Sequence, residues 1–278
     1  MSQSVPLVPS GIAFLDEAWG GVYKGGSYII VGPRKSGRTS LGLQFAEQAG
    51  DGGCIYFTTS RPRKLLIQST ALDLELERHL QDGSITVVRI APPLPVHAER
   101  GAGCEIAERL AEIEQHVLAT RPARVVFDEL TPFAGTDGAS VLPQMFSRLV
   151  ETFEEEGVTS MFILGEPAAA PERVVTEELV RESTASIYLQ RTVAAGASDR
   201  PGGRMLIIPN VGHAEGQFVA RYFVESRRPL QIEPRDAWSR MPLREEWGDD
   251  HGRTLLPDAS SHVVHEPGIP AEHGGARP

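Results

Sequence analysis

Eight consecutive residues, from Gly32 to Thr39, have the types and the spacing of a loop that binds phosphate. They match the pattern G-x-x-x-x-G-K-[ST] at every fixed position except the lysine, where Arg38 stands. In such a loop, backbone N–H groups and the positive end of the following helix surround phosphate oxygens. We expect a nucleotide to be held by Gly32, Pro33, Arg34, Lys35, Ser36, Gly37, Arg38, Thr39 and Ser40.

An apolar run that ends in Asp128 supplies the second half of this chemistry. A hydroxyl and a carboxylate are suitable oxygen ligands for Mg²⁺, so we expect Thr39 to bind the ion directly and Asp128 to bind it through water. The expected cofactors are therefore ATP and Mg²⁺. Glu129 follows directly, and two roles are open for it: a base that activates water, or an acid paired with a nearby arginine. We favour the second role.

Apolar stretches and amphipathic stretches alternate along the chain and predict the elements that position these residues. The pattern is typical of an α/β fold with a mostly parallel sheet, flanked by helices and extended by antiparallel strands near the C-terminus. The expected strands are 28–31, 54–58, 85–90, 124–128, 159–164, 185–189, 204–208 and 217–224, and the expected helices are 39–49, 63–80, one carrying Ile106, Leu110, Ile113 and Val117, and 142–156.

The composition favours one principal domain, which we place at residues 1–234. The chain has 278 residues, of which 41% are hydrophobic and 23% are charged, as is ordinary for a globular protein. Residues 235–278 are rich in Pro, Gly and charged side chains without periodicity, so we expect a disordered or loosely attached tail. The sequence shows neither a leader nor an apolar run long enough to cross a bilayer, which predicts a cytoplasmic protein without a membrane partner.

The net charge limits the class of partner. A formal charge of −10 argues against a protein that mainly holds duplex DNA, because such affinity depends on many cations. A nucleic acid is therefore a less expected partner than a protein. Local basic patches remain, one on the loop at Arg34, Lys35 and Arg38 and one just beyond the next strand at Arg61, Arg63 and Lys64.

Several motifs resemble the RecA-like ATPases of the KaiC and RadA branch. They are the segment Gly11 to Gly21, the pair Gly25 and Gly26 before the loop, the strand Arg124 to Phe133, and the stretch Arg204 to Ile208. The resemblance covers residues 8–234. It implies a RecA-like P-loop core that binds ATP between neighbouring subunits, often in hexameric rings or filaments. The implied partner is a second copy of the chain or a related ATPase-fold subunit.

The chain departs from this family at three catalytic places. The resemblance puts a lysine where Arg38 stands, glutamates in the region Thr58 to Arg61, and a Lys-x-Arg pair at Pro209 to Val211. The longer, planar guanidinium of arginine cannot place a compact charge as lysine does. Hydroxyl groups are too weakly basic to activate water. Losing a transition-state cation can slow phosphoryl transfer by about a thousand-fold.

We therefore expect a degenerate KaiC-like protein that binds a nucleotide, hydrolyses it weakly or not at all, and acts as a regulatory or assembly module. One alternative is an active P-loop ATPase, recombinase-like or a DNA-repair accessory, that uses Glu129 as base. Another is an interaction scaffold that binds no nucleotide, in which Arg34, Lys35 and Arg38 form salt bridges inside an emptied pocket.

Overall fold

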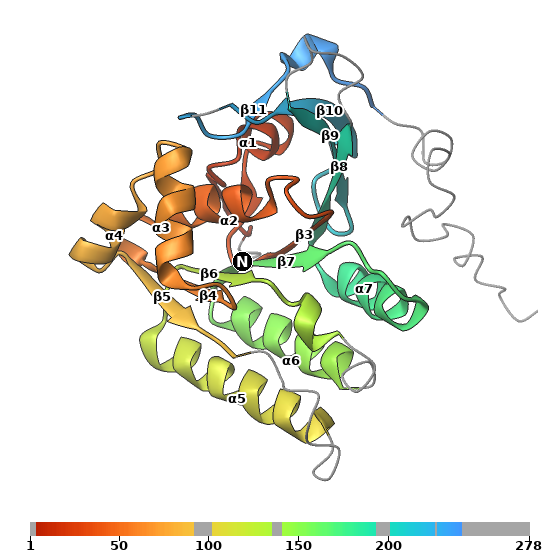
Figure 1. Cartoon of the computed structure of the whole chain (residues 1–278). Coiled ribbons are helices and arrows are strands. Elements are labelled where there is room, and N and C mark those ends of the chain that lie inside the picture. Colours follow the sequence, from red (N-terminus) through yellow and green to blue (C-terminus); the bar gives the residue numbers. More distant parts are fainter. Residues whose placement is uncertain (1–3, 92–101, 135–140, 193–200, 226, 241–278) are drawn as a thin grey trace, which may run out of the picture. The chain divides into compact units, whose positions relative to one another are not determined.

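A nine-stranded mixed sheet organises the chain (Figure 1). The computed structural model describes residues 4–91, 102–134, 141–192, 201–225 and 227–240. The strand order is β11-β10-β9-β8-β3-β7-β6-β4-β5, parallel from β8 to β5 and antiparallel from β8 to β11. Its strands are β3 (Ser27–Gly32), β4 (Cys54–Thr58), β5 (Ile85–Arg89), β6 (Arg124–Asp128), β7 (Thr159–Gly165), β8 (Ala185–Thr192), β9 (Gly202–Pro209), β10 (Phe218–Phe223) and β11 (Gln231–Ile232).

Helices cover both faces of the parallel part of the sheet. In Figure 1, α5, α6 and α7 lie on one face, whereas α1 to α4 lie on the other. A two-stranded sheet of β1 (Leu7–Val8) and β2 (Val22–Tyr23) flanks α1. The helices are α1 (Ala13–Trp19), α2 (Arg38–Glu47), α3 (Pro62–Ala71), α4 (Leu76–Asp82), α5 (Ala102–Thr120), α6 (Leu142–Glu155) and α7 (Ala170–Glu182), and the 3-10 turns are η1 (Gly50–Gly52), η2 (Thr131–Phe133) and η3 (Arg235–Ala237).

The central strands are buried on both faces, which explains their continuous apolar runs. Every residue of β3, β4, β6 and β7 is buried. Three rings stack across neighbouring strands, with centroids 5.0 Å apart for Phe57 and Phe127 and 4.8 Å apart for Phe127 and Phe162. This arrangement confirms the α/β class, with a mostly parallel sheet and antiparallel C-terminal strands.

The helix that we expected over residues 63–80 is two helices, α3 and α4. The turn between them contains Asp73, whose φ of 57° is left-handed. The Ser69 hydroxyl fastens this turn, because it donates to the Leu74 carbonyl at 2.8 Å and accepts from the Leu76 N–H at 3.2 Å. A side chain that bonds nearby backbone competes with the helix. Helix α7 was not expected, since its sequence carries many charged residues and few apolar ones.

The first residues of the expected tail pack against the domain. Residues 235–240 belong to the folded part, because Ser239 pairs with Val219 and the Trp238 ring packs edge-on against Phe14 at 4.6 Å. The Trp238 indole N–H also donates to the Glu233 carbonyl at 2.8 Å. Burial of a large aromatic ring extends the fold beyond the position at which the apolar pattern ends. Residues 241–278 of that expectation lie outside the described residues.

Candidate functional site

The phosphate-loop motif joins β3 to α2 at the carboxyl edge of the parallel strands. Two of its residues have left-handed backbones, Lys35 with φ 64° and Gly37 with φ 96°. A Cβ at Gly32 would lie 2.8 Å from the Leu189 Cβ, so β8 leaves no room for a side chain there. Both glycines of the motif are therefore required by the backbone.

The side chains of this loop divide into exposed and buried groups. Arg34 and Lys35 are exposed, whereas Pro33 is half-buried. Ser36 is 1% exposed, and its hydroxyl has no hydrogen-bond partner among the described residues. Ser40 is also buried, in the first turn of α2. An orphaned buried hydroxyl inside such a loop is consistent with a polar ligand that would satisfy it.

Thr39 and Asp128, the two residues that we expected to hold magnesium, are in contact with each other. The Thr39 hydroxyl donates to Asp128 Oδ1 at 3.3 Å, and the Tyr56 hydroxyl on β4 donates to Oδ2 at 3.0 Å. Asp128 is 6% exposed, and this burial raises the pKa of its carboxyl. The sequence did not lead us to expect Tyr56 in this site. The one feature that could have indicated it is a tyrosine in a strand that pairs with β6.

Arg38 and Glu129 form an ion pair at the start of α2. Arg38 Nη1 lies 3.0 Å from Glu129 Oε1, and the guanidinium is largely buried. Thr131 Oγ1 donates to the same carboxylate oxygen at 2.9 Å and accepts the Gly165 N–H in turn. The cation that replaces the motif lysine is thus paired with a carboxylate from the end of β6. Sequence reasoning missed Thr131.

The region expected to carry catalytic glutamates lies beside Asp128 but offers hydroxyl groups. The Thr59 N–H donates to the Asp128 carbonyl at 3.0 Å, so the turn after β4 runs along the end of β6. Thr58 Oγ1 is occupied by the Ser60 N–H at 3.0 Å. Arg61 then occupies the position directly before α3, makes no side-chain capping bond and is exposed. None of these four residues is a base of useful strength at neutral pH.

The region expected to carry a Lys-x-Arg pair lies at the opposite edge of the sheet. Pro209 pairs with Ala185, which pairs with Tyr28 near the start of β3. The Asn210 amide donates to the Val180 carbonyl at 2.6 Å, so this side chain is used to hold the end of α7. Val211 is 67% exposed and uncharged.

His213 fixes the rest of this loop in an aromatic setting. It is 2% exposed, its ring stacks on Trp19 at 4.2 Å, and its Nε2 lies 3.2 Å from the Tyr28 hydroxyl. The Trp19 indole N–H donates to the Gly216 carbonyl at 2.9 Å. Burial lowers the pKa of His213. The loop is therefore held mainly by rings and neutral hydrogen bonds.

A C-terminal segment also reaches the phosphate loop. Leu230 is buried, and a Cβ at Gly37 would lie 2.8 Å from its Cδ1. The Arg227 N–H donates to the Ala71 carbonyl at 2.8 Å, so the same segment touches the end of α3. Sequence reasoning did not connect this segment with the site, because only the tertiary fold brings it there.

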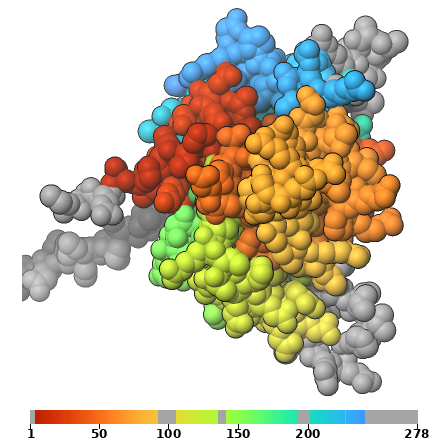
Figure 2. Space-filling view, turned by 90° about the vertical axis from the view of Figure 1, so that its left-hand side faces the viewer, coloured from red at the N-terminus to blue at the C-terminus, as the bar shows by residue number. Residues whose placement is uncertain are grey.

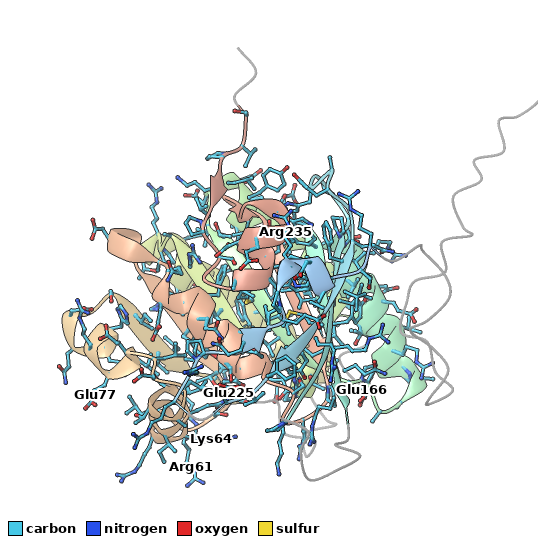
Figure 3. All side chains as sticks on the ribbon, turned by 90° about the horizontal axis from the view of Figure 1, so that it is seen from above. Arg61, Lys64, Glu77, Glu166, Glu225 and Arg235 are labelled. Atoms are coloured by element: carbon cyan, nitrogen blue, oxygen red, sulfur yellow. The ribbon has the colours of Figure 1, made fainter. Side chains whose placement is uncertain are left out.

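Helix α3 presents the second basic cluster at the surface. Arg61, Arg63 and Lys64 are exposed, and Ile67 on the same helix is 64% exposed. Figure 3 shows Arg61 and Lys64 extending outward from this helix, and Figure 2 shows α3 and α4, in orange, on the outer face of the molecule. These cations follow the carboxyl end of β4, as the phosphate loop follows that of β3.

The residues present fit a magnesium-bound nucleotide. Magnesium in such sites takes one or two protein oxygens and several from phosphate and water, and Thr39 and Asp128 provide that number. Within the described ranges no group of three or more His, Cys, Asp or Glu side chains forms an alternative metal site. No described helix combines the length and apolarity that a bilayer-crossing segment requires.

Comparisons with known proteins agree with this geometry. The family described as ATPase: KaiC matches residues 8–211. Circadian clock protein KaiC2 of Synechocystis sp. is 25% identical over 163 residues, which cover 57% of this chain and 27% of that protein. Circadian clock oscillator protein KaiC of Parathermosynechococcus lividus is 25% identical over 190 residues, 67% of this chain and 34% of that protein. The chain thus matches about a third or less of each curated relative.

Proposed function

Because the chain belongs to the KaiC ATPase family, we propose that it binds ATP with Mg²⁺ at the loop from Gly32 to Thr39 and hydrolyses it slowly. In this proposal nucleotide occupancy, rather than rapid turnover, is the useful output, and the protein acts as a regulatory or assembly module. The observation that carries the binding half is the contact between Thr39 Oγ1 and Asp128 Oδ1 at 3.3 Å beside a glycine-dependent loop.

Each residue of the site has a defined role in this proposal. The loop backbone and the start of α2 donate N–H groups to phosphate oxygens. Thr39 and Asp128 hold the ion, and Tyr56 keeps the Asp128 carboxylate turned toward Thr39 by donating to Oδ2 at 3.0 Å. Bound Mg²⁺ supplies positive charge that neutralises phosphate oxygens. The buried Ser36 hydroxyl is a further donor that faces no protein acceptor among the described residues.

Slow hydrolysis follows from the chemistry of the groups that surround this site. The hydroxyls of Thr58 and Ser60 are poor bases, and Thr58 Oγ1 already accepts a hydrogen bond from the Ser60 backbone N–H. The distant loop carries the Asn210 amide, which is neutral and is bonded to the Val180 carbonyl. This loop therefore supplies no cation that could stabilise the transition state in a neighbouring subunit. Without a base and a transition-state cation, the site retains binding groups but lacks two contributions to the rate.

Two other functions make different predictions. In an active ATPase with Glu129 as base, Glu129→Gln would abolish phosphate release without changing nucleotide affinity. In a scaffold that binds no nucleotide, the ion pair of Arg38 with Glu129 at 3.0 Å would stay formed and would occupy the place of the phosphate groups. That ion pair is the one observation that favours the scaffold, and it makes the strength of nucleotide binding the decisive quantity.

Self-association is part of the proposal, and the distribution of charge supports it. Exposed cations follow the carboxyl ends of β3 and β4, whereas α6 and α7 end near the opposite edge with exposed acids. Head-to-tail association of copies would bring the two kinds of charge together. The cations are Arg34, Lys35, Arg61, Arg63 and Lys64, and the acids are Glu155 and Glu182; the neighbouring Glu156 is paired with Arg121 at 3.6 Å.

A titration with a fluorescent ATP analogue tests the proposed function. We expect saturable binding below millimolar nucleotide that weakens when EDTA removes Mg²⁺, together with little phosphate release. A flat titration at millimolar nucleotide with Mg²⁺ present would contradict the proposal and favour the scaffold. Sedimentation of the same sample with and without nucleotide would report whether occupancy changes the assembly.

A further inference from the structure

We propose that Glu129 sets the nucleotide affinity of the phosphate loop by competing with phosphate for Arg38. This inference rests on the proposed function, since it concerns regulation of the same site. Arg38 is the cation at the motif's lysine position, and its Nη1 lies 3.0 Å from Glu129 Oε1. Phosphate can form charge-assisted hydrogen bonds with the whole guanidinium only after the ion pair with the carboxylate has broken.

Burial makes the competition strong enough to matter. The Arg38 side chain is 9% exposed, so water cannot replace the carboxylate as its partner without movement. The Glu129 side chain is 32% exposed and can turn toward solvent when it is displaced. The pair is therefore asymmetric: the arginine is fixed in the site, and the glutamate is the partner able to leave.

The surroundings of Glu129 are built to hold it in the competing position. Thr131 Oγ1 donates to Glu129 Oε1 at 2.9 Å and is itself fixed by the Gly165 N–H. A Cβ at Gly165 would lie 2.8 Å from Glu129 Oε1 and 3.4 Å from Arg38 Nη1, so the absence of a side chain leaves room for the pair. Three elements, α2, η2 and the end of β7, thus meet at one carboxylate oxygen.

This arrangement separates the proposed role of Glu129 from that of a base. Its Oε1 accepts hydrogen bonds from both Arg38 and Thr131, so this oxygen is already engaged by two protein donors instead of by a water molecule. As a competing anion, its removal strengthens binding. As a base, its removal would leave binding unchanged and stop turnover.

The test compares Glu129→Gln with the matched variant Glu166→Gln. Gln keeps the shape of the side chain but removes the charge that opposes phosphate. Glu166 is an exposed acid directly after β7, at the same edge of the sheet, and it forms no ion pair among the described residues (Figure 3). The dissociation constant of a fluorescent ATP analogue with Mg²⁺ is measured for the wild type and both variants, with Tm as a control for folding.

We expect Glu129→Gln to bind the analogue about three- to tenfold more tightly than the wild type, the size expected when one partly exposed ion pair no longer has to be broken. We expect Glu166→Gln to stay within about twofold, since its exposed carboxylate forms no ion pair with Arg38 and its charge is screened by solvent, although its backbone N–H donates to the Gly32 carbonyl. Equal or weaker binding by Glu129→Gln, while the wild type still binds, would overturn the inference and leave the proposed function standing. Flat titrations of all three proteins would overturn both.

Discussion

The loops at the two edges of one sheet are built from different kinds of side chain. At the carboxyl edge, the loop after β3 retains its two required glycines, and Thr39 lies 3.3 Å from Asp128. At the amino edge, the loop after β9 is anchored by Asn210 and by the stack of His213 on Trp19. The first edge carries the groups that we propose bind phosphate and a metal ion. The loop at the second edge is held by ring stacking and neutral hydrogen bonds.

This difference is consistent with our proposal that the chain binds a nucleotide but hydrolyses it slowly. A ligand can be held by one protomer, whereas the family resemblance places a transition-state cation on a neighbour. A loop that has become part of the core, with His213 at 2% exposure, gains stability and loses the freedom to reach another subunit. We therefore predict that substitutions at the amino edge lower the stability of the protein, whereas substitutions at the carboxyl edge weaken its affinity for the nucleotide.

The largest expected effect is at the amino edge. Trp19→Ala removes a ring that is 2% exposed, its stack with His213 and its hydrogen bond to the Gly216 carbonyl. We expect the free energy of unfolding in urea to fall by about 3–5 kcal/mol. Val211→Ala, in the same loop but 67% exposed, is the control and should change it by less than about 0.5 kcal/mol. Similar losses for both variants would mean that the loop is not a packed unit.

At the carboxyl edge, Thr39→Ala should act on affinity. Without the hydroxyl that faces Asp128, the strengthening of nucleotide binding by Mg²⁺ should fall about tenfold or more. Thr39→Ser keeps the oxygen and should retain most of that strengthening. The measurement is an ATP-analogue titration with and without EDTA. If Thr39→Ala responds to EDTA as strongly as Thr39→Ser does, the proposed metal site is wrong.

The pH dependence sharpens the comparison further. Burial lowers the pKa of His213, so the unfolded chain takes up this proton before the folded one does. The contribution of His213 to stability is therefore complete above its ordinary pKa of about 6.5 and is lost as pH falls through that value toward the lowered one. Besides the Tyr23 and Tyr28 hydroxyls, the charged group that acts on it is Glu215, which opposes the shift.

Unfolding curves between pH 5 and 8 should thus show a steeper loss of stability in acid for the wild type than for His213→Gln. The difference between the two curves isolates this residue from the other titrating groups. Parallel curves would show that His213 does not couple protonation to folding. Nucleotide affinity of the folded protein should change little between these two proteins, because the imidazole lies at the other edge.

The smallest expected effect comes from the hydroxyl of Tyr56. Tyr56→Phe removes the donor to Asp128 Oδ2 and should weaken Mg²⁺-dependent binding about two- to fivefold, with a stability loss of about 1 kcal/mol. Tyr222→Phe is a matched control, because that buried hydroxyl has no hydrogen-bond partner among the described residues. Equal effects of the two substitutions on affinity would remove Tyr56 from the site.

Local patterns allowed the sequence to predict the loop and the acid of the site. Gly32, Gly37 and Asp128 belong to contiguous motifs, in which neighbouring residues determine both the backbone conformation and the chemical groups. Tyr56 and Leu230 were missed because they reach the site from other elements, and a hydroxyl or a leucine in an apolar stretch carries no local mark of that role.

The same limit explains the errors in the fold. The single helix expected over 63–80 has leucines on both sides of the break, which the structure identifies by the left-handed Asp73 and the two hydrogen bonds of the Ser69 hydroxyl. The contact of the Trp238 ring with Phe14 lies beyond the last periodic pattern of the sequence, so no local signal indicated it. Individual tertiary contacts decide such boundaries.

The most direct test measures nucleotide binding and phosphate release on one preparation of the whole chain with Mg²⁺. The account predicts saturable binding together with release below about 0.01 per second, which is about a thousand-fold under an ordinary enzyme rate of about 10 per second. Release at ordinary rates would contradict it, because the carboxyl edge would then carry a complete catalytic site. Absence of binding at millimolar ATP would contradict it as well, since the loop would then have the sequence pattern of a phosphate-binding loop without binding phosphate.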